Sequence, residues 1–346
     1  MLSIIPKDAR VSRRTLFKAL GLVAAAAAMP QRARAAALPE TGQEMAALLD
    51  LTKCVGCGAC VEACREANAA RFPAPKKPFP PMHPQRVKAE DFSDKRQVRD
   101  RLTPYNWLFI QTATVQGRAV NIPRRCMHCV NPPCANLCPW GAASKAADGA
   151  VAINADICLG GAKCRDVCPW EIPQRQTGVG LYLDLMPSLA GNGVMYKCDR
   201  CQGRVAAGGL PACLEACPHG VQEFGPRHAI AARARELARS TGGFLYGLEE
   251  NGGTNTVYLS PVPFEAVNSA LMEKRQGGRE RAAKPGHSVQ QAFGRPHLAA
   301  VADVMAGSNA LAWAVLLAPL AGVAQALLGG ARKALNGAKR KENADV

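Results

Sequence analysis

Cysteine is the residue type whose number and placement stand out most for their chemistry. The chain of 346 residues contains 15 cysteines, and each lies in a group of three or four. The groups are Cys54, Cys57, Cys60 and Cys64; Cys126, Cys129, Cys134 and Cys138; Cys158, Cys164 and Cys168; and Cys198, Cys201, Cys213 and Cys217. Thiolates at this density bind metal, and their spacing is typical of iron–sulfur clusters.

The first group, with the spacing C-x2-C-x2-C-x3-C, indicates how the groups combine. In a bacterial run of this kind, three thiolates bind one cluster and the fourth cysteine binds the other cluster of a pair. The proline that ends such a run is replaced by Arg65 here, although a proline follows the last cysteine of each other group. Each group is therefore half of a two-cluster unit, and the sequence predicts two units with four clusters.

The third group lacks one ligand. Alignment with the first group places Gly161 where a cysteine is expected, and glycine has no side chain that could coordinate iron. We therefore predict three [4Fe-4S] clusters and one [3Fe-4S] cluster, which together use all 15 cysteines as iron ligands. The alternative is four [4Fe-4S] clusters, with water or another donor at the open corner beside Gly161.

Zinc and disulfides are the structural alternatives to iron. Pairs of cysteines spaced C-x2-C also form zinc ribbons, but the run from Cys54 to Cys64 leaves too little chain to close separate tetrahedra. An odd number of cysteines argues against a framework made only of disulfides. The sequence contains no nucleotide-binding fingerprint and no nucleophile motif, so we expect a protein that is not itself an enzyme. An enzyme that uses the open corner at Gly161 as a substrate site is the alternative, and turnover by the isolated chain would reveal it.

The net charge of +16 would suit a nucleic-acid partner, but its distribution favours another explanation. Residues 1–36 contribute +6 and residues 331–346 contribute +3, which leaves +7 on the body. Cysteine-bound clusters are anionic, with a charge of about −2 each when oxidised. Four such clusters more than cancel the charge of the body, so we expect no nucleic-acid partner.

Residues 1–37 have the features of a cleaved export signal. Arg13 and Arg14 precede an apolar stretch at residues 19–29, and A-x-A cleavage sites end at Ala35 and Ala37. The paired arginines make the segment similar to a twin-arginine (Tat) signal. An amphipathic helix of the mature fold is the alternative. Because the Tat route exports folded proteins, the chain would leave the cytosol with its clusters in place.

The C-terminal part of the chain predicts a membrane anchor. Residues 304–331 contain no charged side chain and are long enough for a transmembrane helix of about 20 residues. Residues 332–346 form a basic tail that the positive-inside rule places in the cytoplasm. The body would then lie on the periplasmic side of a bacterial inner membrane, joined to the anchor by a flexible linker at residues 275–303. A buried soluble helix is the alternative for residues 304–331.

The elements that must position the cysteines predict a loop-rich α+β fold in residues 38–274. The second and third groups form an internal repeat, in which the turn Asp148-Gly149 leads to a strand at residues 150–153, as in a ferredoxin-like module with two clusters. We also predict β structure at residues 105–122, 244–246 and 256–259, helices at residues 227–239 and 264–273, and a proline-rich loop at residues 72–84.

Side chains beside the cysteines have expected roles of their own. Because the thiolates around His128 already suffice as ligands, we expect this side chain to donate a hydrogen bond toward cluster sulfur or simply to pack. Trp140 and Trp170 each follow a Cys-Pro pair and are expected to shield a cluster from water, with core packing as the alternative. Lys197 and Arg200 lie in the fourth group and are expected to offset cluster charge.

The order of these features resembles a known family. A Tat signal, four cysteine groups and an anchor with a basic flank make the chain similar to the HybA-type iron–sulfur subunits of membrane hydrogenase-2. More broadly, it resembles the ferredoxin-type subunits of periplasmic formate dehydrogenase, nitrite and dimethyl sulfoxide reductase complexes. The resemblance covers nearly the whole chain, although Gly161 departs from the HybA-type pattern. The most specific stretches are Arg125–Cys129, Lys197–Cys201 and Gly209–Pro218.

The resemblance implies which cysteines share a cluster. It pairs the first group with the fourth (module A, residues 54–64 and 198–217) and the second with the third (module B, residues 126–168). We number the four implied ligand sets sites 1 to 4, in this order: Cys54, Cys57, Cys60 and Cys217; Cys64, Cys198, Cys201 and Cys213; Cys126, Cys129, Cys134 and Cys168; Cys138, Cys158 and Cys164. Site 4 would hold the [3Fe-4S] cluster, with Gly161 at its vacant corner.

The resemblance also implies partners and a role in electron transfer. One partner would be an exported catalytic oxidoreductase, such as a hydrogenase or formate dehydrogenase, or a multihaem cytochrome subunit. The other would be a polytopic, quinone-linked subunit in the inner membrane. The iron–sulfur subunit of a cytochrome-linked quinone reductase complex is an alternative. A zinc-binding, membrane-tethered structural protein is another, and it would be colourless rather than brown.

Overall fold

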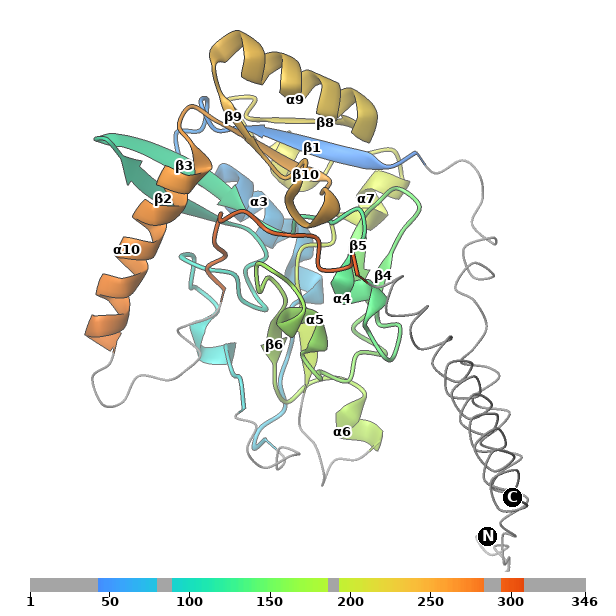
Figure 1. Ribbon diagram of the computed structural model, residues 1–346. Coiled ribbons are helices and arrows are strands. Elements are labelled where there is room, and N and C mark those ends of the chain that lie inside the picture. The colour runs from blue at the N-terminus through green and yellow to red at the C-terminus, as the bar shows by residue number, and fades with distance from the viewer. Residues whose placement is uncertain (1–42, 80–88, 186–192, 283–293, 308–346) are drawn as a thin grey trace, which may run out of the picture. The chain divides into compact units, whose positions relative to one another are not determined.

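The computed structural model of the chain describes residues 43–79, 89–185, 193–282 and 294–307 (Figure 1). The predicted signal peptide, the basic tail and most of the predicted anchor lie outside these ranges. Residues 304–307, where the predicted anchor begins, form a turn. Among the described residues, no helix has the length and hydropathy that crossing a membrane requires.

Short helices and strands are mixed along the chain, which is the combination of α and β structure that the sequence predicts. The strands are β1 (Met45–Asp50), β2 (Phe109–Val115), β3 (Arg118–Arg124), β4 (Ala143–Lys145), β5 (Val151–Ile153), β6 (Gln174–Gln176), β7 (Val194–Tyr196), β8 (Gln222–Pro226), β9 (Phe244–Tyr246) and β10 (Thr256–Ser260). The α-helices are α3 (Ala59–Asn68), α4 (Pro133–Asn136), α5 (Lys163–Asp166), α6 (Tyr182–Leu185), α7 (Gln202–Ala206), α8 (Ala212–Glu215), α9 (Arg227–Thr241) and α10 (Phe264–Ala282). The 3-10 helices are η1 (Ala69–Arg71), η2 (Ser93–Lys95) and η3 (Glu250–Gly252).

The largest sheet has the strand order β8-β1-β10-β9 (Figure 1). Strand β1 pairs antiparallel with β8 and parallel with β10, and β9 pairs antiparallel with β10. The remaining strands form the two-stranded pairs β2-β3, β4-β5 and β6-β7. The large sheet therefore joins a strand from the beginning of the described body to strands from its end.

Alternate residues of β1 face two different cores. Ala46 and Leu48 pack against the apolar side of α9, which covers one face of the sheet (Figure 1). Ala47 and Leu49 belong to the larger core, which also contains cysteines of sites 1 to 3. This alternation follows from the two-residue period of a strand. One strand thus supports both α9 and the cysteine groups.

The predicted helices and strands occur, but several of their ends are shifted. The β region predicted at residues 105–122 is the hairpin of β2 and β3, which spans residues 109–124. Helix α9 ends two residues beyond its predicted limit, and α10 begins at the predicted Phe264 but continues to Ala282. The exposed face of α9 contains Arg233 and other charged side chains.

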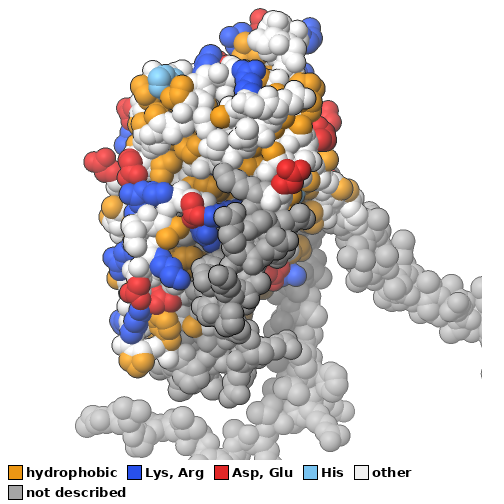
Figure 2. Space-filling model, turned by 90° about the vertical axis from the view of Figure 1, so that its left-hand side faces the viewer, with side chains coloured by type: hydrophobic (Ala, Val, Ile, Leu, Met, Phe, Trp, Pro, Cys, Tyr) orange, Lys and Arg blue, Asp and Glu red, His pale blue; other side chains and the backbone are white. Residues whose placement is uncertain are grey.

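Charged side chains of both signs are interspersed on the face shown in Figure 2. On this face, the described Lys and Arg side chains are not gathered into a single patch. Elsewhere in the described residues, exposed charges also form ion pairs, such as Arg99 with Glu62 and Arg204 with Glu215.

The predicted linker, residues 275–303, differs from our expectation where the structure describes it. Residues 275–282 continue α10, and residues after 293 lie against the body. Leu298 is buried, and its backbone N–H donates to Oδ1 of Asn268 at 2.9 Å. The backbone O of Gly294 accepts a hydrogen bond from Leu102 at 2.8 Å. The composition of residues 275–303 suggested a flexible linker. Composition carries no information about contacts with residues that are distant in the sequence, so it could not reveal these.

Tyr246 connects this segment to the core, and its replacement is predicted to destabilise the protein. Its hydroxyl accepts a hydrogen bond from Trp170 Nε1 and donates one to the backbone O of Ala299, both at 2.8 Å. Tyr246→Phe would leave both of these groups without their partner. We expect it to lower the free energy of unfolding of the iron-loaded protein by about 1–3 kcal/mol, measured by chemical denaturation.

Tyr182→Phe is the control for this substitution. Tyr182 lies on α6 and is only partly buried, so its change is expected to stay within about 0.5 kcal/mol. Equal stability of the Tyr246→Phe variant and the wild type would contradict the role given to the hydroxyl.

Candidate iron–sulfur sites

The pairing of β1 with β8 brings the first and fourth cysteine groups together. Leu49 lies opposite Gln222, and the backbone N–H of Asp50 donates to Val221 O at 2.8 Å. The first group follows β1 and the fourth group precedes β8. Because the strands are antiparallel, both groups lie at the same end of the pair.

Module B repeats this arrangement on a smaller scale. Strands β4 and β5 form an antiparallel hairpin in which Ala143 lies opposite Ile153. Cys138 lies five residues before β4, and Cys158 lies five residues after β5. In each module, an antiparallel strand pair thus brings two cysteine groups to one place.

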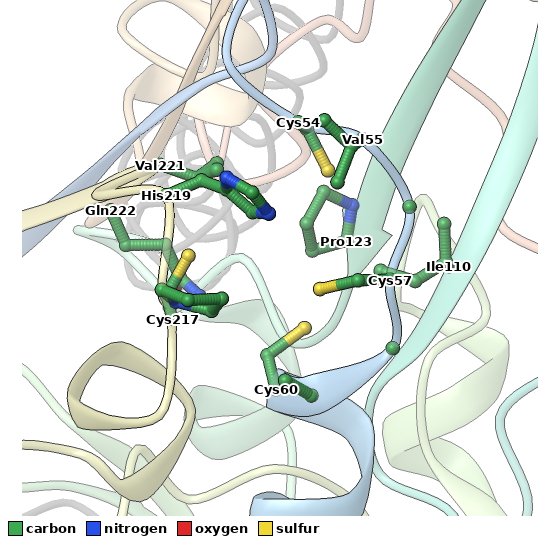
Figure 3. A pocket seen from close by; sticks show the side chains of 14 residues that line it. Cys54, Val55, Cys57, Cys60, Ile110, Pro123, Cys217, His219, Val221 and Gln222 are labelled. Atoms are coloured by element: carbon green, nitrogen blue, oxygen red, sulfur yellow. The ribbon is translucent and has the colours of Figure 1, made fainter.

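Site 1 surrounds a small cavity (Figure 3). The side chains of Cys54, Cys57, Cys60 and Cys217 point into this common space (Figure 3). Cys57 is exposed and Cys60 is buried, so the site lies just below the surface. The structure thus brings together the four cysteines of this predicted set.

Helix α3 contributes Cys64 to site 2. Cys60 and Cys64 are four residues apart on this helix, so α3 contributes one cysteine to site 1 and one to site 2. Burial raises the pKa of Cys64 well above its usual value, and Cys198, Cys213 and Cys201 raise it further. Cys64, Cys198 and Cys213 belong to the same buried core, in agreement with their effect on Cys64.

Site 3 surrounds a second small cavity, which is lined by its four cysteines. Trp170 also lines this cavity and is 1% exposed, so it shields the site from water in the way we expected. Trp140 is 61% exposed, and the same expectation is wrong for it. The difference arises because Trp140 lies in a surface turn before β4, whereas Trp170 is enclosed by the core.

Site 4 contains Cys138, Cys158 and Cys164, which flank the β4-β5 hairpin. Backbone N–H groups donate to two of the sulfurs at 3.5 Å, from Ala143 to Cys138 and from Met195 to Cys158. Burial raises the pKa of Cys164 to about 12, and neighbouring thiolates, including that of Cys158, contribute to the shift. The three cysteines are therefore close enough to act on one group.

Gly161 has the position of a missing fourth ligand. It follows Gly160, whose φ is +62°. The residues at the same place in the other groups, Gly56, His128 and Arg200, also have positive φ. Gly161 is exposed, and a Cβ atom there would meet no other atom within 4 Å. The shared loop conformation thus aligns Gly161 with the second cysteine of each other group, namely Cys57, Cys129 and Cys201.

Each site lies against the next in the series from 1 to 4. Cys60 and Cys64 lie on one helix, His128 contacts both Cys126 and Cys198, and Cys134 shares an apolar cluster with Cys158 and Cys164. The pKa values of Cys60, Cys164 and Cys198 agree with this order. Burial is the main cause of the raised pKa of each thiol, and a thiolate of the adjacent site raises it further. Such effects require the two groups to be near one another. The interacting pairs are Cys60 with Cys213, Cys198 with Cys126, and Cys164 with Cys134.

Buried cations lie among the sulfurs. Arg125 donates from Nη1 to Cys213 Sγ at 2.9 Å, and its Nε and Nη2 have no hydrogen-bond partner among the described residues. Burial alone would lower the pKa of Arg125, but the thiolates of Cys213 and Cys198 raise it overall. Lys197 is also buried, beside site 3. The role of Arg125 was not predicted from the sequence, although Arg125 lies directly before the second group and begins one of the stretches most specific to the family.

The residues present fit iron–sulfur clusters. All 15 cysteines are free thiols, gathered in sets of four, four, four and three. A buried guanidinium such as that of Arg125 requires an anionic partner, which a cysteine-bound cluster supplies. Among the residues that the structure describes, no group of three or more His, Cys, Asp or Glu side chains is placed to hold a single metal ion.

Comparisons with known proteins agree with this chemistry. Two family profiles described as "4Fe-4S dicluster domain" match residues 53–142 and 118–227. The chain is 31% identical to the hydrogenase-2 operon protein HybA of Escherichia coli O157:H7, over 78% of this chain and 86% of that protein. It is 30% identical to the formate dehydrogenase-O iron-sulfur subunit of Escherichia coli K12, over 63% of this chain and 67% of that subunit. A protein of Nitratidesulfovibrio vulgaris is 32% identical over 73% of this chain, which spans just under two thirds (64%) of that relative.

The strand-paired thiol sites and the two profile matches define an iron–sulfur protein of the ferredoxin-like dicluster class. Within this class, the extent of the match to HybA is decisive. The chain belongs to the HybA-type family of iron–sulfur subunits.

Loss of iron from the protein is predicted to accelerate as the pH falls. Burial raises the pKa of Cys60, Cys129 and Cys198 to about 12, so without iron these groups are protonated at neutral pH. Each thiolate that leaves iron therefore takes up a proton. We expect a chelator to bleach the visible absorbance of the protein faster at about pH 6 than at about pH 8.

The iron-free chain provides a control in which pH acts in the opposite direction. A thiol pKa that is higher in the folded state stabilises the fold below the unfolded value of about 8.5. That contribution is lost as the pH rises from about 8.5 toward about 12. The free energy of unfolding of the iron-free chain should therefore fall in alkali. A rate of iron loss that does not depend on pH would contradict the assignment of these buried thiols as ligands.

Proposed function

We propose that the chain is the non-catalytic electron-transfer subunit of a membrane-bound oxidoreductase complex that faces the periplasm. The observation that carries this proposal is the series of four thiol sites, in which each site lies against the next. Iron–sulfur clusters accept and release single electrons, so a row of them conducts electrons through a protein. Site 1, where Cys57 is exposed, is an end at which electrons can be exchanged.

The protein itself contributes spacing, burial and charge compensation. Strand pairing fixes which cysteines meet, and Arg125 and Lys197 place positive charge beside sulfur inside the core. Hydrogen bonds to sulfur and the burial of a cluster are the main means by which proteins set its potential. These contributions suit a conductor of electrons, and none of them requires a substrate pocket.

The names of the relatives indicate the class of partner. HybA is named as a hydrogenase-2 operon protein, and the formate dehydrogenase-O relative as an iron-sulfur subunit. We propose an exported catalytic oxidoreductase as one partner and a polytopic, quinone-linked membrane subunit as the other. A multihaem cytochrome in place of the catalytic subunit is the second candidate, because the departure at Gly161 leaves the identity of the electron donor open.

We further propose that site 4 holds the [3Fe-4S] cluster. Gly161 offers no ligand, and the loop that contains it is held by Arg175, which donates to Gly160 O at 3.1 Å. Glu90 is a buried carboxylate near this loop, but both of its oxygens accept hydrogen bonds from Arg165 and Arg175 at 2.7–2.9 Å. Glu90 is therefore occupied as an ion-pair partner and does not supply the fourth ligand.

The number and type of clusters can be tested by electron paramagnetic resonance. The anaerobically purified chain should be brown, take up electrons reversibly without turning over a substrate, and show a three-iron signal when oxidised. In Gly161→Cys, a thiol would enter open space at the vacant corner. We expect this variant to lose the three-iron signal and gain iron, because a four-iron cluster replaces the incomplete one.

Gly307→Cys is the matched control, since it adds a thiol at another exposed glycine with no atom near its Cβ position. It should keep the three-iron signal. Four complete cubanes in the wild type would disprove the three-iron assignment. A colourless chain that binds zinc would disprove the electron-transfer function itself.

Export and membrane attachment complete the proposal. They are supported by the paired arginines of the N-terminal segment and by the uncharged stretch at residues 304–331 with its basic flank. Replacing Arg13 and Arg14 together with Lys should leave iron-loaded protein in the cytoplasm, as measured by cell fractionation and immunoblotting.

Arg10→Lys is the control for this experiment, because it makes the same chemical change outside the pair. It should not alter export. Normal delivery of the doubly substituted chain to the periplasm would rule out the Tat route.

A further inference from the structure

His128 lies between the two modules and contacts a cysteine of each. It is completely buried. Its backbone N–H donates to Sγ of Cys126 in site 3 at 3.5 Å. Its imidazole Nε2 lies 3.7 Å from Sγ of Cys198 in site 2. A single residue thus spans the junction between the inner sites of modules A and B.

The hydrogen bonds of the imidazole fix its protonation. The backbone N–H of Val151 donates to Nδ1 at 3.0 Å, so Nδ1 carries no hydrogen. In the neutral ring the hydrogen is therefore on Nε2, which faces Cys198 Sγ. The ring is thus a neutral donor toward sulfur.

The imidazole contact is distinct from the hydrogen bond of the backbone. In the fourth group the backbone N–H of Arg200 donates to Cys198 Sγ at 3.3 Å, just as that of His128 donates to Cys126. These backbone bonds belong to the loop conformation that the groups share. The imidazole contact instead crosses from module B into module A, and the shared loop does not explain it.

We propose that His128 is a positioning residue that couples sites 2 and 3, and that its Nε2–H donates to Cys198 Sγ and raises the reduction potential of the cluster at site 2. This inference rests on the proposed electron-transfer function. The direction follows because a donor to sulfur stabilises the additional negative charge of a reduced cluster. Removing the donor should therefore lower the potential at site 2 and leave the outer sites 1 and 4 unchanged.

Three substitutions at this position separate the donor from the packing. An Asn side chain places its amide near the position of Nδ1, where it can accept from Val151 but does not reach Cys198. A Gln side chain reaches the position of Nε2 and can still donate to Cys198. Leu fills much of the space and provides neither bond. The test is a redox titration of the full, iron-loaded chain followed by electron paramagnetic resonance, for the wild type, His128→Asn, His128→Gln and His128→Leu.

We expect Asn and Leu to lower the potential of one four-iron cluster. The equilibrium constant for its reduction should fall about tenfold, which is ~59 mV for a one-electron couple. Gln should stay close to the wild type. His228→Asn, a change of the same kind at a histidine that lines neither described cavity, should leave every potential unchanged.

Each other outcome counts against the inference. Unchanged potentials in Asn and Leu, or an equal shift in Asn and Gln, would overturn it. Loss of iron from Asn and Gln alike would also overturn it, because His128 would then act through packing alone. If the wild type held no reducible clusters, the proposed function would fail instead, so the two failures are distinguishable.

Discussion

Buried sulfur atoms must lie close to one another in this protein although their ionised forms repel, and the rest of the structure depends on meeting that constraint. Burial and neighbouring thiolates both raise the pKa of Cys64 and Cys60. The chain meets the constraint in two ways. Antiparallel strand pairs hold the cysteine groups together, and cationic side chains enter the core beside them.

The buried cations would be costly in most proteins. Arg125 is buried with two of its guanidinium nitrogens lacking a partner among the described residues, and Lys197 is buried beside site 3. An unpaired buried charge is strongly unfavourable, so these residues stabilise the fold only when negative charge is present next to them. Sulfur ligands and cations therefore depend on each other. The same dependence explains why a net positive body need not bind nucleic acid.

Much of the candidate site could be predicted from the sequence because cysteine spacing is a local property. It indicated the grouping of thiols and singled out Gly161, which the backbone conformation aligns with the second cysteine of the other groups. What the sequence could not give was any property that depends on distant contacts. Composition described residues 275–303 as a linker, whereas Leu298 is buried against the body. Trp170 and Trp140 both end a Cys-Pro-Trp motif, but Trp170 is buried in the core and Trp140 is exposed at the surface.

The order of the cysteine groups along the chain has a consequence for how the protein is made. Module B is drawn from one continuous stretch, so its hairpin can close as soon as residues 126–168 have left the ribosome. Module A needs the first and fourth groups, whose strands β1 and β8 pair across most of the body. The cysteines of the first group are therefore synthesised some 150 residues before Cys217, the last of their partners. The cysteines of module B are thus complete in the growing chain before those of module A.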